Sequence, residues 1–122
     1  MKPKKPIETL ILTLRGQKVI LDADIAELYG VPTKVFNQAV KRNADRFPED
    51  FLLLLIPEEA EEVQRSRSQI VTLNRGQNIK YLPHAFTEYG AIMAATILNS
   101  PEAVAMSVFV VRAFMQMRCQ GS

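Results

Sequence analysis

The stretch DADIAELYGVPTKVFNQAVKRN, residues 22–43, has the spacing of a helix-turn-helix unit. Such a unit needs a small residue in the middle of its first helix, where the second helix crosses closely, and Ala26 meets this need. Four residues later the chain must turn with a positive φ angle, and Gly30 stands there. The other apolar positions of the motif are Val31, Phe36 and Ala39. A DNA-binding unit has this spacing, and so does a purely structural helical corner.

The second helix of the unit is predicted over Thr33–Asp45, because Pro48 pushes the residue before it out of the α region. The residues predicted to face inward are Val35, Phe36, Ala39 and Val40. The residues predicted to face outward are Thr33, Lys34, Asn37, Gln38, Lys41 and Arg42. None of them is acidic. Asn and Gln can bridge adenine, and Lys can meet guanine or phosphate, so this composition suits a helix in a major groove.

The predicted DNA contacts fall into two groups. The candidates for base edges are Thr33, Lys34, Asn37 and Gln38. The candidates for phosphates, which set affinity and register but not sequence, are Lys41, Arg42 and Arg46. Arg15 and Arg75 are secondary phosphate candidates at the tips of two predicted hairpins.

The sequence predicts a small antiparallel sheet. The first hairpin is predicted from strands at residues 7–14 and 18–21. The stretch Phe51–Ile56 is apolar throughout and has the length of a strand, so we predict a central buried strand there. A second hairpin is predicted from Ser68–Leu73 and Ile79–Leu82.

Local end signals predict three more helices. Pro57 and the acids after it open a helix over Glu58–Gln64. Thr87 caps a helix over Glu88–Leu98. Ser100 and Pro101 start a last helix that runs to Arg118. The expected fold is therefore α+β, with a small antiparallel sheet packed against four or five helices.

Composition limits the class of protein. The chain has 122 residues, of which 48% are hydrophobic and 23% charged, which fits one globular domain. We expect this domain over residues 7–118, with a basic tail at 1–6 and a short tail at 119–122. No apolar run approaches the 18 residues or so of a membrane span, so a cytoplasmic protein is expected. Net charge is +4 over residues 1–46, −6 over 47–63 and +4 over 64–122.

No set of residues predicts catalysis or metal binding. His84 has no partner at ligand spacing, and the single cysteine, Cys119, excludes an internal disulfide. The glutamates of residues 58–62 are explained by the first turns of a solvated helix. We therefore expect a protein that is not an enzyme and that has no cofactor or metal.

The last helix is apolar on all sides. Its large apolar residues are Val104, Met106, Val108, Phe109, Val110, Val111, Phe114, Met115 and Met117. Such a helix is either central in the core or covered on one side by another chain. We expect a homodimer through this helix, with burial by its own chain as the alternative.

Several blocks of the sequence closely resemble the KilA-N DNA-binding family, in its branch of phage and prophage antirepressor N-terminal domains. The blocks are residues 25–31 (IAELYGV), 40–51 (VKRNADRFPEDF) and 85–90 (AFTEYG), and the resemblance spans residues 7–114. It implies an α+β domain that binds double-stranded DNA, with the second helix, Thr33–Arg46, as the functional stretch.

The combined expectation is sequence-selective binding of double-stranded DNA in the transcriptional control of prophage genes. The alternative is a protein-interaction module that acts through the acidic helix and the apolar last helix. DNA binding should weaken steeply with salt, whereas apolar association should not.

Overall fold

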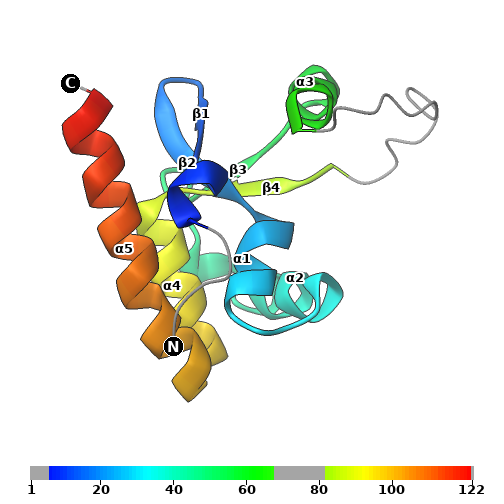
Figure 1. Cartoon of the computed structure of the whole chain (residues 1–122). Coiled ribbons are helices and arrows are strands. Elements are labelled where there is room, and N and C mark those ends of the chain that lie inside the picture. Colours follow the sequence, from blue (N-terminus) through cyan, green and yellow to red (C-terminus); the bar gives the residue numbers. More distant parts are fainter. Residues whose placement is uncertain (1–5, 68–81, 122) are drawn as a thin grey trace.

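Figure 1 shows the computed structural model, in which residues 6–67 and 82–121 are described. These residues form five α-helices, two short 3-10 helices and four strands, an α+β fold as predicted. In chain order the elements are η1 (Ile7–Leu10), β1 (Leu12–Leu14), β2 (Gln17–Leu21), α1 (Asp22–Leu28), α2 (Thr33–Arg42), η2 (Ala44–Arg46), β3 (Leu52–Leu54), α3 (Pro57–Arg67), β4 (His84–Phe86), α4 (Glu88–Leu98) and α5 (Pro101–Gly121). The predicted second hairpin and Arg75 fall on residues 68–81, outside the described residues.

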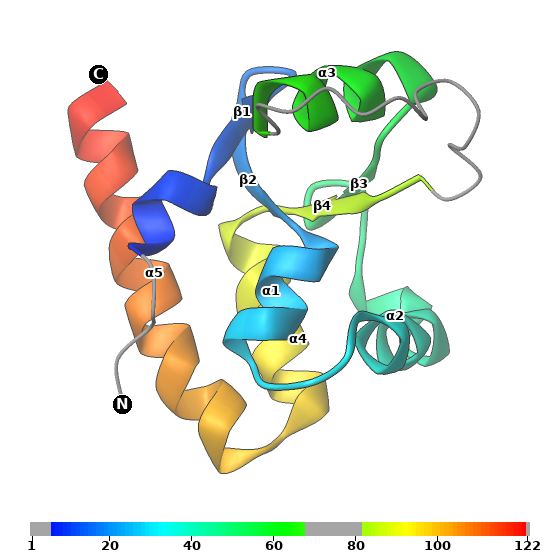
Figure 2. The ribbon, with the colours of Figure 1, turned by 45° about the vertical axis from the view of Figure 1, so that its right-hand side comes forward.

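The sheet separates two apolar cores. Its strands are antiparallel, in the order β1-β2-β4-β3. Successive side chains of a strand point to opposite faces. Val19, Leu21 and Ala85 therefore pack with Ala60 of α3, whereas Ile20 and Phe86 join the larger core with α1, α2, α4 and α5. Figure 2 shows the result, with α3 on one side of the sheet and the other helices on the opposite side.

The predicted first hairpin is confirmed, but its first strand is shorter than expected. Arg15 and Gly16 form the turn with φ angles of 52° and 80°, the pattern of a tight two-residue hairpin turn. Residues 7–10 form η1 instead of a strand. The amide of Thr9 donates to the carbonyl of Pro6, and Ile7 and Ile11 enter the main core.

Within the described residues, the central buried strand predicted at Phe51–Ile56 is not found: β3 spans only Leu52–Leu54. Among the strands that the structure describes, β3 lies at an edge and pairs only with β4. The exposed fractions of Leu54 and Ile56 are 54% and 49%. The apolar run predicts two buried faces, but β3 ends at Leu54 and the chain enters α3 at Pro57.

The predicted starts of α4 and α5 are confirmed. The Thr87 hydroxyl accepts a hydrogen bond from the amide of Gly90, and the Ser100 hydroxyl accepts one from the amide of Ala103. Each cap satisfies an amide that has no partner within its own helix. Asn99 adopts the left-handed conformation between the two helices.

Gly90 allows α4 to approach the start of β3 very closely. A Cβ atom at this position would lie 2.0 Å from the carbonyl oxygen of Phe51. That oxygen accepts a hydrogen bond from the amide of Thr87, and the Thr87 hydroxyl donates to the carbonyl of Asp50. The segment before β3 is thus fixed against the first turn of α4.

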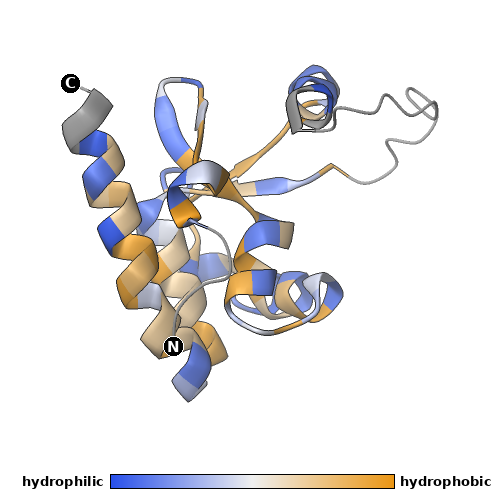
Figure 3. Ribbon diagram, in the orientation of Figure 1, coloured by the Kyte–Doolittle hydropathy of each residue, from blue (hydrophilic) through white to orange (hydrophobic). Residues whose placement is uncertain are grey.

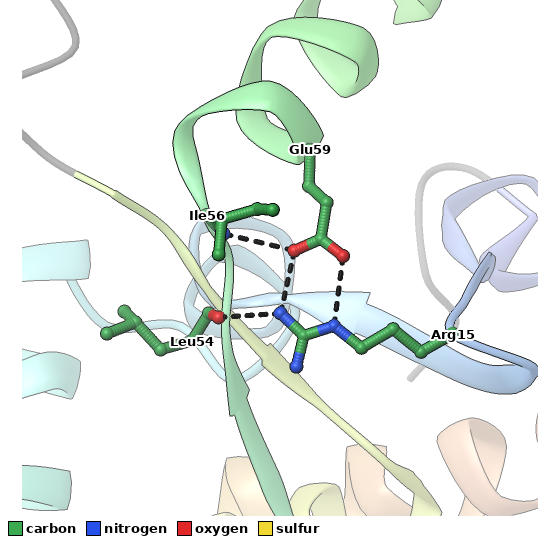
Figure 4. Close-up of polar contacts among 4 residues, drawn as sticks. All are labelled: Arg15, Leu54, Ile56 and Glu59. Carbon is green, nitrogen blue, oxygen red and sulfur yellow. Dashed lines mark hydrogen bonds and ion pairs between the residues drawn. The ribbon is translucent and has the colours of Figure 1, made fainter.

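Arg15 joins the first hairpin to α3 (Figure 4). Its Nε and one terminal nitrogen donate to the two carboxylate oxygens of Glu59, at 2.9 and 2.7 Å, and the same terminal nitrogen donates to the carbonyl of Leu54. Glu59 also accepts from the amide of Ile56, the residue before α3. The hydrogen bond from Arg15 holds the pKa of Glu59 below its usual range.

We expect Gly90→Ala to destabilise the protein by more than about 1 kcal/mol, because the added methyl group would collide with backbone rather than with a movable side chain. At an ordinary helical position this change stabilises by about 0.5–1 kcal/mol. Urea unfolding measures the difference. Gly16→Ala is the control, since a Cβ atom there meets nothing within 4 Å and carries only the cost of positive φ. A Gly90→Ala variant as stable as the wild type would contradict the close approach.

We expect Glu59→Gln to lower the melting temperature at pH 7 and to have a smaller and smaller effect as the pH falls below the lowered pKa of Glu59. The folded state lowers the pKa of Glu59, so its stabilisation is present above the ordinary glutamate pKa and disappears as the pH falls through the lowered value. Thermal melts across pH measure this dependence. Glu62→Gln, at an exposed position of the same helix, serves as the control.

Candidate nucleic-acid interface

The turn between α1 and α2 is held by local hydrogen bonds. The amide of Val31 donates to the carbonyl of Ala26, and the amide of Gly30 donates to the carbonyl of Glu27. Together with a φ angle of 77° at Gly30, this is the Schellman helix end. The predicted glycine turn is confirmed, and α2 begins at Thr33 as predicted. The predicted end at Asp45 is wrong: α2 ends at Arg42, and Ala44–Arg46 form the 3-10 helix η2.

Helix α2 is anchored by two buried residues. Phe36 is fully buried and Val40 is 6% exposed. The ring of Phe36 packs edge-on against the ring of Phe86 in β4, with a centroid distance of 5.3 Å. The ring of Phe47 also packs edge-on against Phe86, with a centroid distance of 5.9 Å. One face of α2 is therefore fixed on the sheet and α4.

The exposed face of α2 is rotated from the predicted one. Its exposed residues are Lys34, Val35, Gln38, Lys41 and Arg42. Val35 was predicted to face inward, but it is 47% exposed. Thr33 and Asn37 were predicted to face outward, but both are half-buried. Because a helix turns about 100° per residue, the burial of Phe36 and Val40 brings Thr33 and Asn37 to the flank and moves Val35 outside.

The buried carboxylate of Asp22 connects α2 to the rest of the domain. Asp22 is 1% exposed. One of its oxygens accepts from the amide of Ala23, and the other accepts from the Asn37 side chain at 3.2 Å and from the amide of His84 at 3.3 Å. The Nδ1 atom of His84 lies 3.7 Å from the second oxygen. The side-chain amide of Asn37 therefore points toward Asp22, while the residue stays half-buried at the flank of α2.

Sequence reasoning missed this cluster. His84 was predicted to have no partner at ligand spacing, and its contact with Asp22 was not foreseen. They are 62 residues apart, and nothing local signals their contact. One local feature could have indicated that Asp22 is buried. It directly follows the apolar stretch Val19–Leu21, whose residues are themselves buried.

Positive charge gathers at α2 and just beyond it. Lys34, Lys41, Arg42 and Arg46 are all exposed, and α2 contains no acidic residue. Asp45, in η2, is the acid nearest to them in sequence. The four glutamates of α3 lie on the other side of β3 and β4 (Figure 1, Figure 2).

Arg15, a secondary phosphate candidate, is bound by other residues of the domain. Its guanidinium is held by Glu59 and the carbonyl of Leu54, and Glu59 balances its charge. The partner Glu59 lies 44 residues away in the sequence, so the local sequence around Arg15 does not reveal this ion pair.

Two other kinds of site are not found in the described parts of the chain. Residues 6–67 and 82–121 contain no group of three His, Cys, Asp or Glu residues that could hold a metal ion. Within the same ranges no helix is both long and apolar enough to cross a membrane.

Comparison with known proteins places this geometry in a family. Searches of curated proteins and of solved structures gave no significant match. The ORF6N domain model, however, matches residues 9–97, from η1 to α4. The ORF6N domain is a phage- and prophage-associated domain related to the KilA-N and antirepressor N-terminal domains. The expected resemblance is confirmed at this broader level: the chain belongs to the ORF6N domain family.

Proposed function

We propose that the domain binds double-stranded DNA, with sequence selectivity, by placing the exposed face of α2 in the major groove. The observation that carries the proposal is the acid-free row of Lys34, Gln38, Lys41 and Arg42 on a helix fixed by a glycine turn. A major groove admits one α-helix, and cations on that helix neutralise the phosphates beside it.

The exposed side chains would make two kinds of contact, to base edges and to phosphates. Lys34 and Gln38 lie on the outermost face and would read base edges, and Val35 could contact a thymine methyl group. Lys41, Arg42 and Arg46 would contact phosphates and fix the register. Thr33 would reach DNA from the flank of α2. Asn37 would act by positioning α2 through Asp22 as well as by any base contact.

The biological role that fits this activity is control of transcription from phage or prophage genes. The family assignment supports the phage context. The basic surface and the turn support a binding role rather than a catalytic one.

A protein-interaction module is the second candidate. It is favoured by the exposed glutamates Glu58, Glu61 and Glu62 of α3 and by exposed apolar residues on α5. Titration with salt separates the two candidates, because DNA binding releases counterions and falls steeply with ionic strength.

We expect Gln38→Ala to reduce the preference for a selected duplex over a scrambled one by about 1–3 kcal/mol, the worth of a good base contact. Lys41→Ala should weaken both duplexes alike and lower the salt slope by about one. Fluorescence anisotropy with duplexes enriched from a random pool measures both effects. Glu62→Gln, on the far side of the sheet, is the control and should leave the affinity for the selected duplex unreduced. Unchanged discrimination in Gln38→Ala would exclude this helix face as the reader.

We expect Asn37→Ala to lower the free energy of unfolding by about 1–3 kcal/mol, because the buried carboxylate of Asp22 loses a donor. The selected and the scrambled duplex should both bind more weakly, since α2 is less firmly positioned. Urea unfolding and anisotropy on the same preparations measure the two effects. Normal stability with lost discrimination would instead assign Asn37 to base reading alone.

A further inference from the structure

Helix α5 carries a stripe of apolar residues that the described parts of the chain leave open. Val104, Val108 and Met115 are 51%, 47% and 49% exposed, and Val111 is partly exposed. The opposite face, with Met106, Val110 and Phe114 among others, is buried against α4 and η1. The middle of α5 is coloured mostly hydrophobic in Figure 3. The described parts of the chain therefore do not supply the complete burial of this stripe that the alternative of a central helix requires.

The spacing of the stripe reads the same in both directions. Residues 104, 108, 111 and 115 follow one another at intervals of four, three and four, which keeps them on one side of a helix. A two-fold interface requires that residue i contacts j while j contacts i. If two α5 helices pack antiparallel, Val104 lies opposite Met115 and Val108 lies opposite Val111. Every member of the stripe then meets an apolar partner.

We infer that α5 pairs with α5 of a second copy of this chain, antiparallel, in this register. The inference does not rest on the proposed DNA binding. Helices α5 and α2 lie on opposite sides of the domain with α4 between them (Figure 1, Figure 2). Pairing through α5 therefore leaves α2 of each copy uncovered.

The charges on α5 favour the antiparallel arrangement. Arg118 and Pro101 extend the stripe at its two ends, in the same four-and-three spacing. A parallel pair would place Arg118 opposite Arg118 of the second copy. The antiparallel pair places it opposite Pro101 of the second copy, where this like-charge contact is absent. Arg118 also contacts Glu88 of its own chain, and its side chain is 56% exposed.

The residues beside the stripe also fit. Arg112 and Ala105 are both exposed and lie on the same side of the stripe. In the antiparallel register Arg112 of one copy lies next to Ala105 of the other, where the small side chain leaves room for the arginine stem. An exposed apolar stripe of this length is the kind of surface that marks an interface in soluble proteins.

Light scattering tests the pairing. The wild type should have a mass about twice the 13.8 kDa of the chain, and Val108→Glu should reduce it to one chain while the circular dichroism spectrum is kept. Val35→Glu is the matched control: Val35 is also 47% exposed, but it lies on α2, so this variant should remain a dimer. Val104→Glu repeats the test at the end of the stripe. A wild-type mass that stays near 13.8 kDa as the concentration rises, or a Val108→Glu variant that stays dimeric, would overturn the inference.

Crosslinking tests the register. Val104→Cys and Met115→Cys are each made in a Cys119→Ser background and oxidised under mild conditions, alone and mixed. The mixture should form a disulfide-linked pair at least tenfold faster than either variant alone. Faster linkage of Val104→Cys to itself would show a parallel pair and overturn the antiparallel register. Neither assay uses DNA, so failure here is distinct from failure of DNA binding.

Discussion

The burial of the Asp22 carboxylate is the constraint that orders this domain. A charge removed from water costs several kcal/mol unless hydrogen bonds replace its hydration, and Asp22 collects donors from the start of α1, from α2 and from β4. The three elements must therefore meet at one point. Because Asn37 supplies one of the donors, this hydrogen bond supports the rotation of α2 that the burial of Phe36 and Val40 sets, and with it the choice of side chains that face solvent.

The parts of the fold that depend on neighbouring residues could be predicted from sequence. The turn at Gly30, the hairpin at Arg15-Gly16 and the cap at Thr87 each need only a few residues and their preferred backbone angles. The parts that depend on distant partners could not. The stretch Phe51–Ile56 is apolar enough for a central strand, but among the described strands β3 pairs only with β4, a pairing that no local pattern reveals.

The candidate interface shows the same division. The polar face of α2 was evident from the sequence, because helical spacing alone places Lys34, Gln38 and Lys41 on one side. The positions of Val35 and Asn37 were not, since a shift of one residue in the buried face changes which flank each occupies. Arg15 was predicted as a phosphate candidate, and its contact with Glu59, 44 residues away, could not be predicted from the residues around it.

Among the strands that the structure describes, the edge position of β3 has a consequence for aggregation. Edge strands with exposed apolar side chains can template the addition of strands from other molecules, and the run Phe51–Ile56, with six apolar residues and no charge, is of the type that aggregates. Arg15 occupies the carbonyl of Leu54 and brings a charged group to the end of this strand. The contact that joins the hairpin to α3 thus also places a charge at this apolar stretch, the position in which charged residues protect strands from aggregation.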